Sequence, residues 1–156
     1  MTQMGAEFIG DDSIEADAEM LALAVETMLS IGVKEFQLTV GNVDFLNSLF
    51  EDAILDEEAK ERVTEMINNR NFFGVEDYLE QTQLARSTKE AFSALDGLVG
   101  GVEVLEKARK LTDNEMALKA ISILEDIYEG LKECGCEKYV SFDLGMLSKY
   151  NYYTGI

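Results

Sequence analysis

The sequence predicts an α+β fold in which a small sheet is flanked by helices and interrupted by a helical insertion. Apolar residues at 36, 38 and 40 alternate with polar ones, which is typical of a strand over residues 34–40 with one wet face. Apolar residues three and four positions apart over 14–29 and 116–131 predict two long amphipathic helices. The absence of proline from all 156 residues agrees with a helix-rich chain.

The first elements follow from local signals. Residues 3–9 are predicted to end a strand that Gly10 closes, and Asp11-Asp12-Ser13 then begins a helix that Gly32 ends. The helix dipole favours acids in the first turns, which explains the cluster Asp11, Asp12, Glu15, Asp17 and Glu19. The cluster lacks the spacing of a calcium loop, and we therefore expect no metal site there.

The character of the chain changes between Val43 and about Leu98. Short, strongly acidic helices are predicted at 43–53, 57–69, 74–82 and 88–98. Phe72, Phe73 and Tyr78 are expected to give these helices a small core of their own. We therefore predict a helical insertion over residues 46–98, between two pieces of one core formed by residues 1–45 and 99–156.

The remaining elements return to the core. A helix is predicted over 101–110, and the capping box Thr112-x-x-Glu115 predicts the start of the next helix, which Gly135 ends. Strands are expected at 139–145 and 150–156. Because the chain starts and stops inside predicted strands, we expect it to be an internal fragment of a larger protein.

Composition excludes several classes of function. The net charge of −18 disfavours nucleic acids and anionic lipids as partners, and zero histidines exclude every mechanism that needs an imidazole. No apolar run is long enough to span a membrane, so we expect a cytoplasmic protein. Cys134 and Cys136 are predicted to be small residues at a helix exit, since two thiols alone make a poor zinc site. No metal and no cofactor are expected.

Two polar groups are candidates for ligand binding. Residues four apart in a strand point to the same face, so Gln3 and Glu7 would project together and suit an amino group. The alternative is a surface polar pair. Tyr150, Tyr152 and Tyr153 lie near the end of the chain, where a tyrosine hydroxyl gives a pocket a polar handle. Their alternative role is that of core aromatics on a sheet.

The end of the chain carries a resemblance. The stretch SFDLGMLSKYNYYTGI resembles the histidine-binding signature of class II histidyl-tRNA synthetases, Arg-Gly-Leu-Asp-Tyr-Tyr-Thr-Gly. We call the matching residues, 148–155, the signature segment. TQMGAEFIG followed by ADAEM is similar to motif 2 of that family and the helix after it. The resemblance implies a class II synthetase-like antiparallel sheet, with a variable insertion near residues 46–98.

One departure from this family bears on function. Ser148 stands at the position of the catalytic arginine, and a serine hydroxyl cannot supply a guanidinium's charge or its fork of donors. Asn42 also stands where relatives commonly carry histidine. A synthetase paralogue without that arginine resembles the ATP phosphoribosyltransferase regulatory subunits of histidine biosynthesis. This implies a noncatalytic subunit that activates the short catalytic subunit and relays feedback inhibition by histidine. The alternative is a divergent histidyl-tRNA synthetase.

The resemblance also implies a ligand site for free histidine. Gln3 and Glu7 match positions that hold the α-amino group of histidine, and Tyr152 and Tyr153 match the tyrosines around its side chain. The arginines of motif 2 would precede Gln3. Both families form a homodimer through a motif 1 that lies outside this chain.

Overall fold

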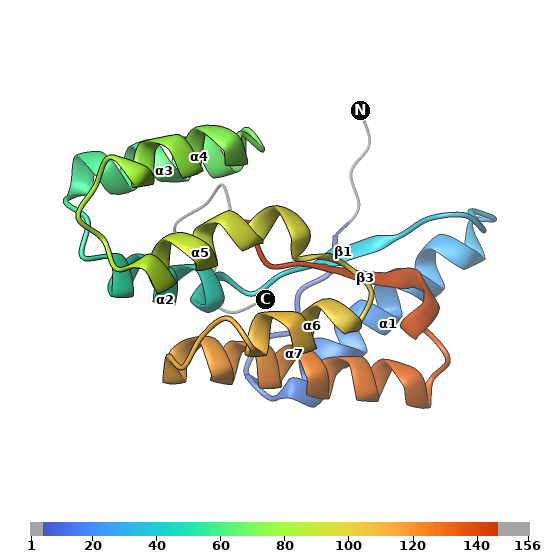
Figure 1. The fold of residues 1–156 in the computed structure, drawn as a ribbon. Helices are drawn as coiled ribbons and strands as arrows, with labels where there is room; N and C mark the ends of the chain where they lie inside the picture. Colours follow the sequence, from blue (N-terminus) through green and yellow to red (C-terminus); the bar gives the residue numbers. More distant parts are fainter. Residues whose placement is uncertain (1–4, 147–156) are drawn as a thin grey trace.

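A computed structural model of the protein describes residues 5–146 (Figure 1). The elements follow in the order α1 (Ile14–Ser30), β1 (Leu38–Val40), α2 (Val43–Ala53), α3 (Glu57–Asn68), α4 (Phe72–Glu80), α5 (Arg86–Ala94), η1 (Leu95–Gly97), β2 (Val99–Gly100), α6 (Glu103–Arg109), α7 (Glu115–Glu133), η2 (Glu137–Tyr139) and β3 (Val140–Asp143). The α+β class is therefore confirmed. None of the helices described is long and apolar enough to cross a membrane.

The sheet has three strands in the order β1-β3-β2. β1 and β3 are parallel, with Leu38 opposite Val140, whereas β2 is antiparallel to β3. Residues 35, 37 and 39 are exposed, which confirms the predicted wet face. Because β1 and β3 are parallel, the carboxyl ends of these two strands lie at the same edge of the sheet.

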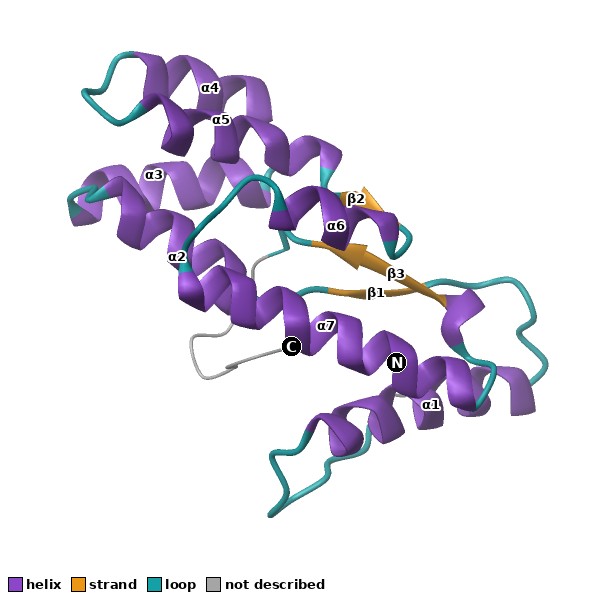
Figure 2. Cartoon of the chain, turned by 60° about the horizontal axis from the view of Figure 1, so that its bottom comes forward, coloured by secondary structure: helices purple, strands orange, loops and turns teal. Residues whose placement is uncertain are grey.

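Helix α7 lies along the apolar face of the sheet, with α1 beside it (Figures 1 and 2). The ring of Tyr128 on α7 makes an edge contact with Phe142 of β3, with 6.1 Å between ring centroids. Six α7 residues at helical spacing are buried: Ala117, Ala120, Ile121, Leu124, Ile127 and Leu131. The apolar stripe predicted for 116–131 is thus buried, and it packs against α1, α2 and α6 as well as the sheet.

Helices α2 to α5 occupy the other end of the molecule, with α3 and α4 farthest from α7 (Figure 1). Helix α2 packs against both α7 and α5, and its buried residues belong to the same apolar cluster as those of α7. Phe50 of α2 meets Phe92 of α5 edge to face at 5.4 Å. The helical region is therefore joined to the rest of the core through α2, an element that crosses the predicted boundary at residue 46.

Three predictions are wrong in detail. Residues 5–9 form no strand, because no described segment pairs with them, and all are exposed. Asn114, rather than Thr112, caps α7: its Oδ1 accepts from the amides of Met116 and Ala117, while Thr112 Oγ1 accepts only from Asn114 N. Phe73 is 81% exposed and adds nothing to a core. The strand predicted at 150–156 lies outside the described residues.

Glycines at two helix ends behave as predicted. Gly32 follows α1 with φ +89° and Gly135 follows α7 with φ +71°. At each end two amides bond back to carbonyls of the last turn, which is the Schellman arrangement. A residue with left-handed backbone is needed at this position, and glycine adopts it without steric penalty.

Helix α2 ends with a strained residue. Ile54 adopts the left-handed conformation (φ 46°, ψ 45°) although it is β-branched and 90% exposed. The left-handed region costs about 1–2 kcal/mol for a residue with a Cβ. We expect Ile54→Gly to raise the free energy of unfolding by about 1 kcal/mol, because it removes this strain and sacrifices no buried surface. Urea unfolding measures the change.

Ile31→Gly is the matched control for this prediction. Ile31 also caps a helix and is 66% exposed, but its φ is −84°. Glycine there relieves no strain and only adds entropy to the unfolded chain, so we expect equal or lower stability. A stability gain in Ile31→Gly as large as that in Ile54→Gly would contradict the explanation.

Candidate functional site

Only one of the predicted ligand-binding residues lies among the described residues. Glu7 is exposed in the irregular stretch before α1, and residues 5–9 form no strand. Gln3, Tyr152, Tyr153 and Ser148 lie outside the described residues. The histidine site therefore remains a prediction. Residues 143–146, which precede the signature segment in the sequence, are described, and they lie against Gly41.

The carboxyl ends of β1 and β3 meet at a junction. Gly41 follows β1, and Asp143 ends β3. A Cβ on Gly41 would lie 2.6 Å from the backbone oxygen of Asp143 and 3.3 Å from Cβ of Met146, so the two chain segments touch only because this residue has no side chain. Gly41 thereby fixes the distance between β1 and the turn that precedes the signature segment.

Asn42 is buried at the same junction. Its side chain is the N-cap of α2, with Oδ1 accepting from the amide of Asp44 at 2.9 Å. Its exposed fraction is 1%, and its Nδ2 has no hydrogen-bond partner among the described residues. Asn42 is thus a buried helix cap at the edge of the sheet.

An ion pair ties the helical region to this junction. Arg70, in the turn between α3 and α4, donates from Nη1 to Oδ1 of Asp143 at 3.3 Å and from Nη2 to Oδ2. The Asp143 side chain is 3% exposed and that of Arg70 is 48% exposed. Asp143 Oδ1 also accepts from the amide of Gly145 at 3.0 Å. The carboxylate therefore has two partners, one from the turn that follows it and one from a helix pair distant in sequence.

Sequence reasoning missed this pair, although one signal was available. In the last 18 residues only Asp143 and Lys149 are charged, and Asp143 is the only charged residue of the predicted strand 139–145. A single carboxylate in such a place needs a buried partner. The partner could not be named, because 73 positions separate Arg70 from Asp143 and no local pattern connects them.

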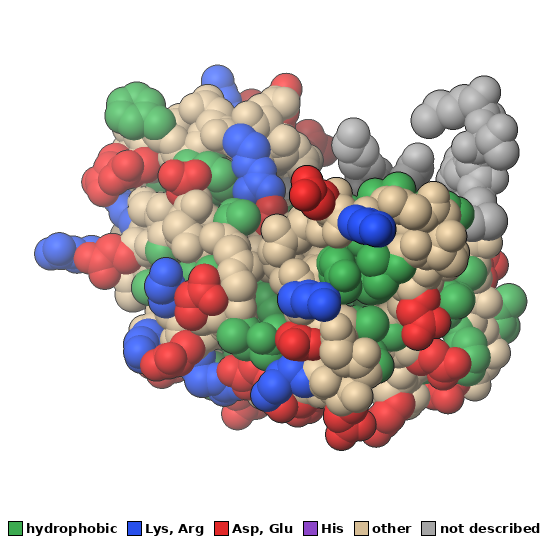
Figure 3. Space-filling model, turned by 90° about the vertical axis from the view of Figure 1, so that its right-hand side faces the viewer, with side chains coloured by type: hydrophobic (Ala, Val, Ile, Leu, Met, Phe, Trp, Pro, Cys, Tyr) green, Lys and Arg blue, Asp and Glu red, His purple; other side chains and the backbone are tan. Residues whose placement is uncertain are grey.

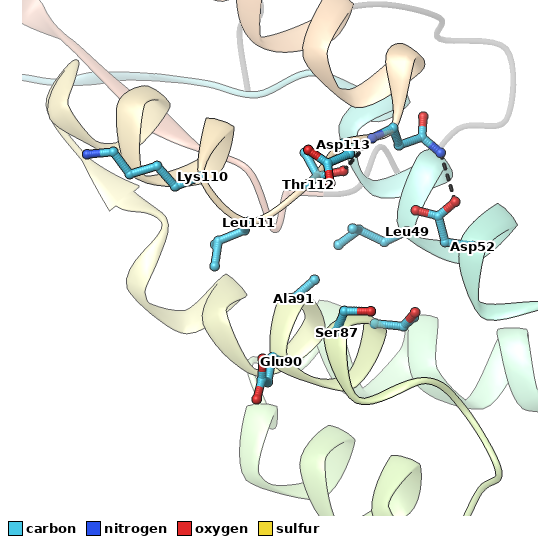
Figure 4. Close-up of a pocket in the computed structure, with 11 residues that line it drawn as sticks. Leu49, Asp52, Ser87, Glu90, Ala91, Lys110, Leu111, Thr112 and Asp113 are labelled. Atoms are coloured by element: carbon cyan, nitrogen blue, oxygen red, sulfur yellow. Dashed lines mark hydrogen bonds between the residues drawn. The ribbon is translucent and has the colours of Figure 1, made fainter.

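A groove of about 580 Å³ lies between α2, α5 and the segment that joins α6 to α7 (Figure 4). Asn114 closes one side by donating from Nδ2 to Asp52 Oδ1 at 2.9 Å. The groove is lined by aliphatic residues, by Ser87 and Thr112, and by charged groups of both signs. Among the lining residues no hydroxyl is hydrogen-bonded to a carboxylate, so no activated nucleophile is present there. The groove therefore has no catalytic arrangement.

The position of the acidic cluster, just before and within the first turns of α1, explains its composition. Hydrogen bonds from Ser13 lower the pKa of Asp11, whereas burial raises the pKa of Asp17. Residues 5–146 contain no group of three acidic or cysteine side chains arranged to hold a metal ion. On the face drawn in Figure 3, Lys and Arg side chains are dispersed among acidic ones, around an apolar area.

The two cysteines lie at the end of α7, as predicted. Cys134 is exposed at the C-cap and Cys136 is buried two residues later. Burial raises the pKa of the Cys136 thiol to about 11, and the neighbouring Cys134 and the carboxylates of Glu26 and Glu137 act in the same direction. Cys136 is explained as a small buried residue at a helix exit, whereas Cys134 lies exposed at the C-cap.

We expect the two thiols to differ strongly in reactivity. The thiolate is the nucleophile, and a pKa two units above the ordinary 9.0 leaves about 100-fold less thiolate on Cys136 at pH 8. Iodoacetamide should therefore modify Cys134 first, as read by mass spectrometry. Cys136→Ser should leave the fast reaction intact and Cys134→Ser should abolish it. Equal rates at the two positions would contradict the prediction.

The same thiol contributes to the pH dependence of stability. Because the pKa of Cys136 is higher in the folded state, the unfolded chain loses this proton first as the pH rises. Stability is then lost between about pH 9 and pH 11, and Cys136→Ser should reduce that loss.

Comparison with known proteins decides the family. A sequence model described as histidyl-tRNA synthetase matches residues 1–156. The chain belongs to this family. Within the histidyl-tRNA synthetase family, its curated relatives carry another name: ATP phosphoribosyltransferase regulatory subunit. The relative from Clostridium acetobutylicum is 36% identical over 100% of this chain and 39% of its own length. That from Ruminiclostridium cellulolyticum is 39% identical over 99% of this chain and 37% of its own length.

Solved structures of the histidyl-tRNA synthetase family have the same fold. One described as an ATP phosphoribosyltransferase regulatory subunit/histidyl-tRNA synthetase from Bacillus halodurans C superposes with a TM-score of 0.86 and 30% identity, over 94% of this chain and 38% of that one. A histidyl-tRNA synthetase from Nostoc sp. PCC 7120 superposes with a TM-score of 0.75 and 23% identity, over 93% of this chain and 36% of that one. The class II synthetase-like fold is therefore confirmed. The chain spans about two fifths of the length of its relatives.

Proposed function

We propose that the chain is part of a noncatalytic regulatory subunit of ATP phosphoribosyltransferase, which acts in the first step of histidine biosynthesis in the cytoplasm. The subunit activates the short catalytic subunit and relays feedback inhibition by free histidine. The observation that carries the proposal is the name shared by its curated relatives, which are 34–39% identical over nearly the whole chain.

The sequence of the signature segment supports the noncatalytic role. Ser148 stands in the position of the synthetase arginine, and the loss of one such group costs about 100- to 1,000-fold in rate. Tyr152 and Tyr153 keep the residue types that surround the histidine side chain. Gln3 and Glu7 supply an amide and a carboxylate for the α-amino group. The retained residues suit binding of histidine, and the lost one belongs to its activation.

Residues 46–98 form the helical insertion in this proposal, and residues 1–45 and 99–156 form pieces of the synthetase-like core. The acidic composition of the helices and their place beyond the sheet support this division. The partners are the catalytic subunit, free histidine and a second copy of the regulatory subunit. No cofactor and no nucleic acid take part.

A divergent histidyl-tRNA synthetase is the second candidate. The description of the matching family model and the name of the Nostoc structure favour it. Histidine-dependent exchange of pyrophosphate into ATP distinguishes the two candidates, because it requires the activation step that Ser148 is expected to abolish.

Mixing the complete protein with a short catalytic subunit tests the first proposal. We expect transferase activity to rise on mixing and to fall again when histidine is added, with no ATP–pyrophosphate exchange by the complete protein alone. No activation and no sensitivity to histidine would overturn the proposed function, and clear exchange would favour the synthetase.

Glu7→Gln tests the ligand site directly. Removing the charge from a group that holds an ammonium costs about 1.5–3 kcal/mol, so the dissociation constant of histidine should rise at least tenfold in calorimetry. Glu15→Gln is the matched control, since Glu15 is also exposed near the N-terminus but lies in the first turn of α1. Equal binding by both variants and the wild type would remove Glu7 from the site.

A further inference from the structure

Cys134 is an exposed thiol in a turn whose packing does not require it. The turn after α7 has the same hydrogen bonds as the turn after α1: Cys136 N donates to Leu131 O at 2.9 Å, and Val33 N donates to Met28 O at 3.1 Å. In such a turn this residue packs back on the helix, which accounts for Cys136, 6% exposed. The motif has no such contact for the C-cap residue, where Cys134 lies exposed. Free cysteine is among the residue types most often buried, so Cys134 needs another explanation.

The turn places a second thiol at bonding distance from that of Cys134. Gly135, between the two cysteines, has a left-handed backbone with φ +71°. A residue with helical backbone of either hand separates the Cα atoms of its two neighbours by ~5.4 Å. Disulfides span Cα separations of roughly 4.4–6.8 Å. The backbone of this turn therefore holds Cys134 and Cys136 at a spacing that a disulfide can bridge.

The two sulfur atoms lie together at the carbonyl end of α7. Cys134 Sγ donates to the backbone oxygen of Leu131 at 3.2 Å, and Cys136 Sγ donates to that of Cys134 at 3.8 Å. The Cys134 side chain is also a hydrogen-bonding neighbour of the Cys136 thiol, which is one of the causes that raise the pKa of Cys136. One thiol is open to solvent while its neighbour is covered. This arrangement suits an attacking cysteine beside a resolving cysteine.

We propose that Cys134 and Cys136 form a dithiol–disulfide site, which small disulfides such as oxidised glutathione convert reversibly into an internal disulfide. The Cys134 thiolate attacks one sulfur of the oxidant and releases one glutathione thiolate. Cys136 then loses its proton to solvent, and its sulfur attacks the Cys134 sulfur and releases the second glutathione thiolate. Two protein thiols are oxidised, and one small disulfide is reduced to two thiols. This proposal goes beyond the proposed function and does not depend on it.

This disulfide should be easily reduced. A loop closed across a single residue restricts the unfolded chain little, so the bond gains little from loop closure. Cys134 is exposed to an incoming thiol, and exposed disulfides belong to the labile class. The site also lies where α7 passes into β3, because Cys136 O accepts from Tyr139 N at 3.0 Å just before β3 begins at Val140. The reversible change is therefore made at the connection between α7 and the central strand of the sheet.

Peptide mapping of the complete protein tests the proposal. The protein is treated with oxidised glutathione, blocked with iodoacetamide, digested and weighed by mass spectrometry. We expect the wild-type peptide that carries both cysteines to be lighter by two hydrogen atoms and free of glutathione. Cys136→Ser should keep glutathione on Cys134 at least about tenfold longer than the wild type, because no second thiol displaces it. Cys134→Ser is the matched control, in which the buried Cys136 should stay unmodified. Excess reduced glutathione should restore both wild-type thiols.

Three results would overturn the proposal. If the wild type keeps glutathione on Cys134 as long as Cys136→Ser does, Cys136 is not a resolving thiol. If oxidation instead links two protein molecules through Cys134, the exposed thiol reacts without its neighbour. If an internal disulfide forms but excess reduced glutathione does not open it, the bond is structural and the site is not reversible. None of these results bears on histidine binding or on activation of the transferase, so the proposed function is tested separately.

Discussion

Phe92→Ala is expected to lower the free energy of unfolding by about 3–5 kcal/mol, the usual cost of truncating a fully buried phenylalanine. Phe92 has no exposed surface, and its ring meets that of Phe50 edge to face. Phe50 belongs to α2, which packs in turn on α7. The cavity would therefore open between α5 and α2, the helix that connects α5 to α7. Urea unfolding followed by far-UV circular dichroism gives the change.

Phe73→Ala is the matched control, because it truncates the same residue type within the same helical region. Phe73 is largely exposed, and substitutions at such positions change stability by no more than about 0.5 kcal/mol. Similar losses in the two variants would mean that Phe73 is covered in the complete protein. A loss below about 1 kcal/mol for Phe92→Ala would contradict the single core that joins α2, α5 and α7.

Helices could be predicted from the sequence where local signals agree. The predicted helix at 43–53 has the bounds of α2, since Asn42 supplies a cap, Gly41 ends the strand before it, and its apolar residues keep helical spacing. The start of α7 was assigned to the wrong cap because Thr112 and Asn114 are both good capping residues. Only the tertiary contact of Asn114 with Asp52 adds a preference for one of them.

The strand expected at residues 5–9 and the contact of Arg70 with Asp143 both depend on partners distant in sequence, which a local sequence pattern does not identify. Residues 5–9 have a strand-like composition, yet a strand needs a neighbour to bond its amides and carbonyls, and the described residues offer none. Arg70 resembles any surface arginine at a helix end until its left-handed backbone and its contact with Asp143 are seen together. The signature segment could be recognised by resemblance, but the contact between Arg70 and Asp143 before it could not.

Gly41→Ala should have the second largest effect on stability, a loss of about 2 kcal/mol. The new Cβ would stand 2.6 Å from the backbone oxygen of Asp143, closer than van der Waals contact allows. That oxygen belongs to a strand end held by β2, by Gly145 and by Arg70, so it cannot move away without breaking other contacts. We therefore expect β1 to shift, with faster amide exchange at Val40 and Phe142 as well as a lower urea midpoint.

Gly97→Ala is the control that separates crowding from the general effect of replacing a glycine. A Cβ at Gly97 meets nothing within 4 Å, and its backbone is not left-handed. Alanine there removes only entropy from the unfolded chain, which leaves stability equal or slightly higher. If Gly41→Ala were equally harmless, the close approach of β1 to the end of β3 would not be a constraint. A loss confined to Gly41→Ala would show that the close packing of the two strand ends constrains the fold.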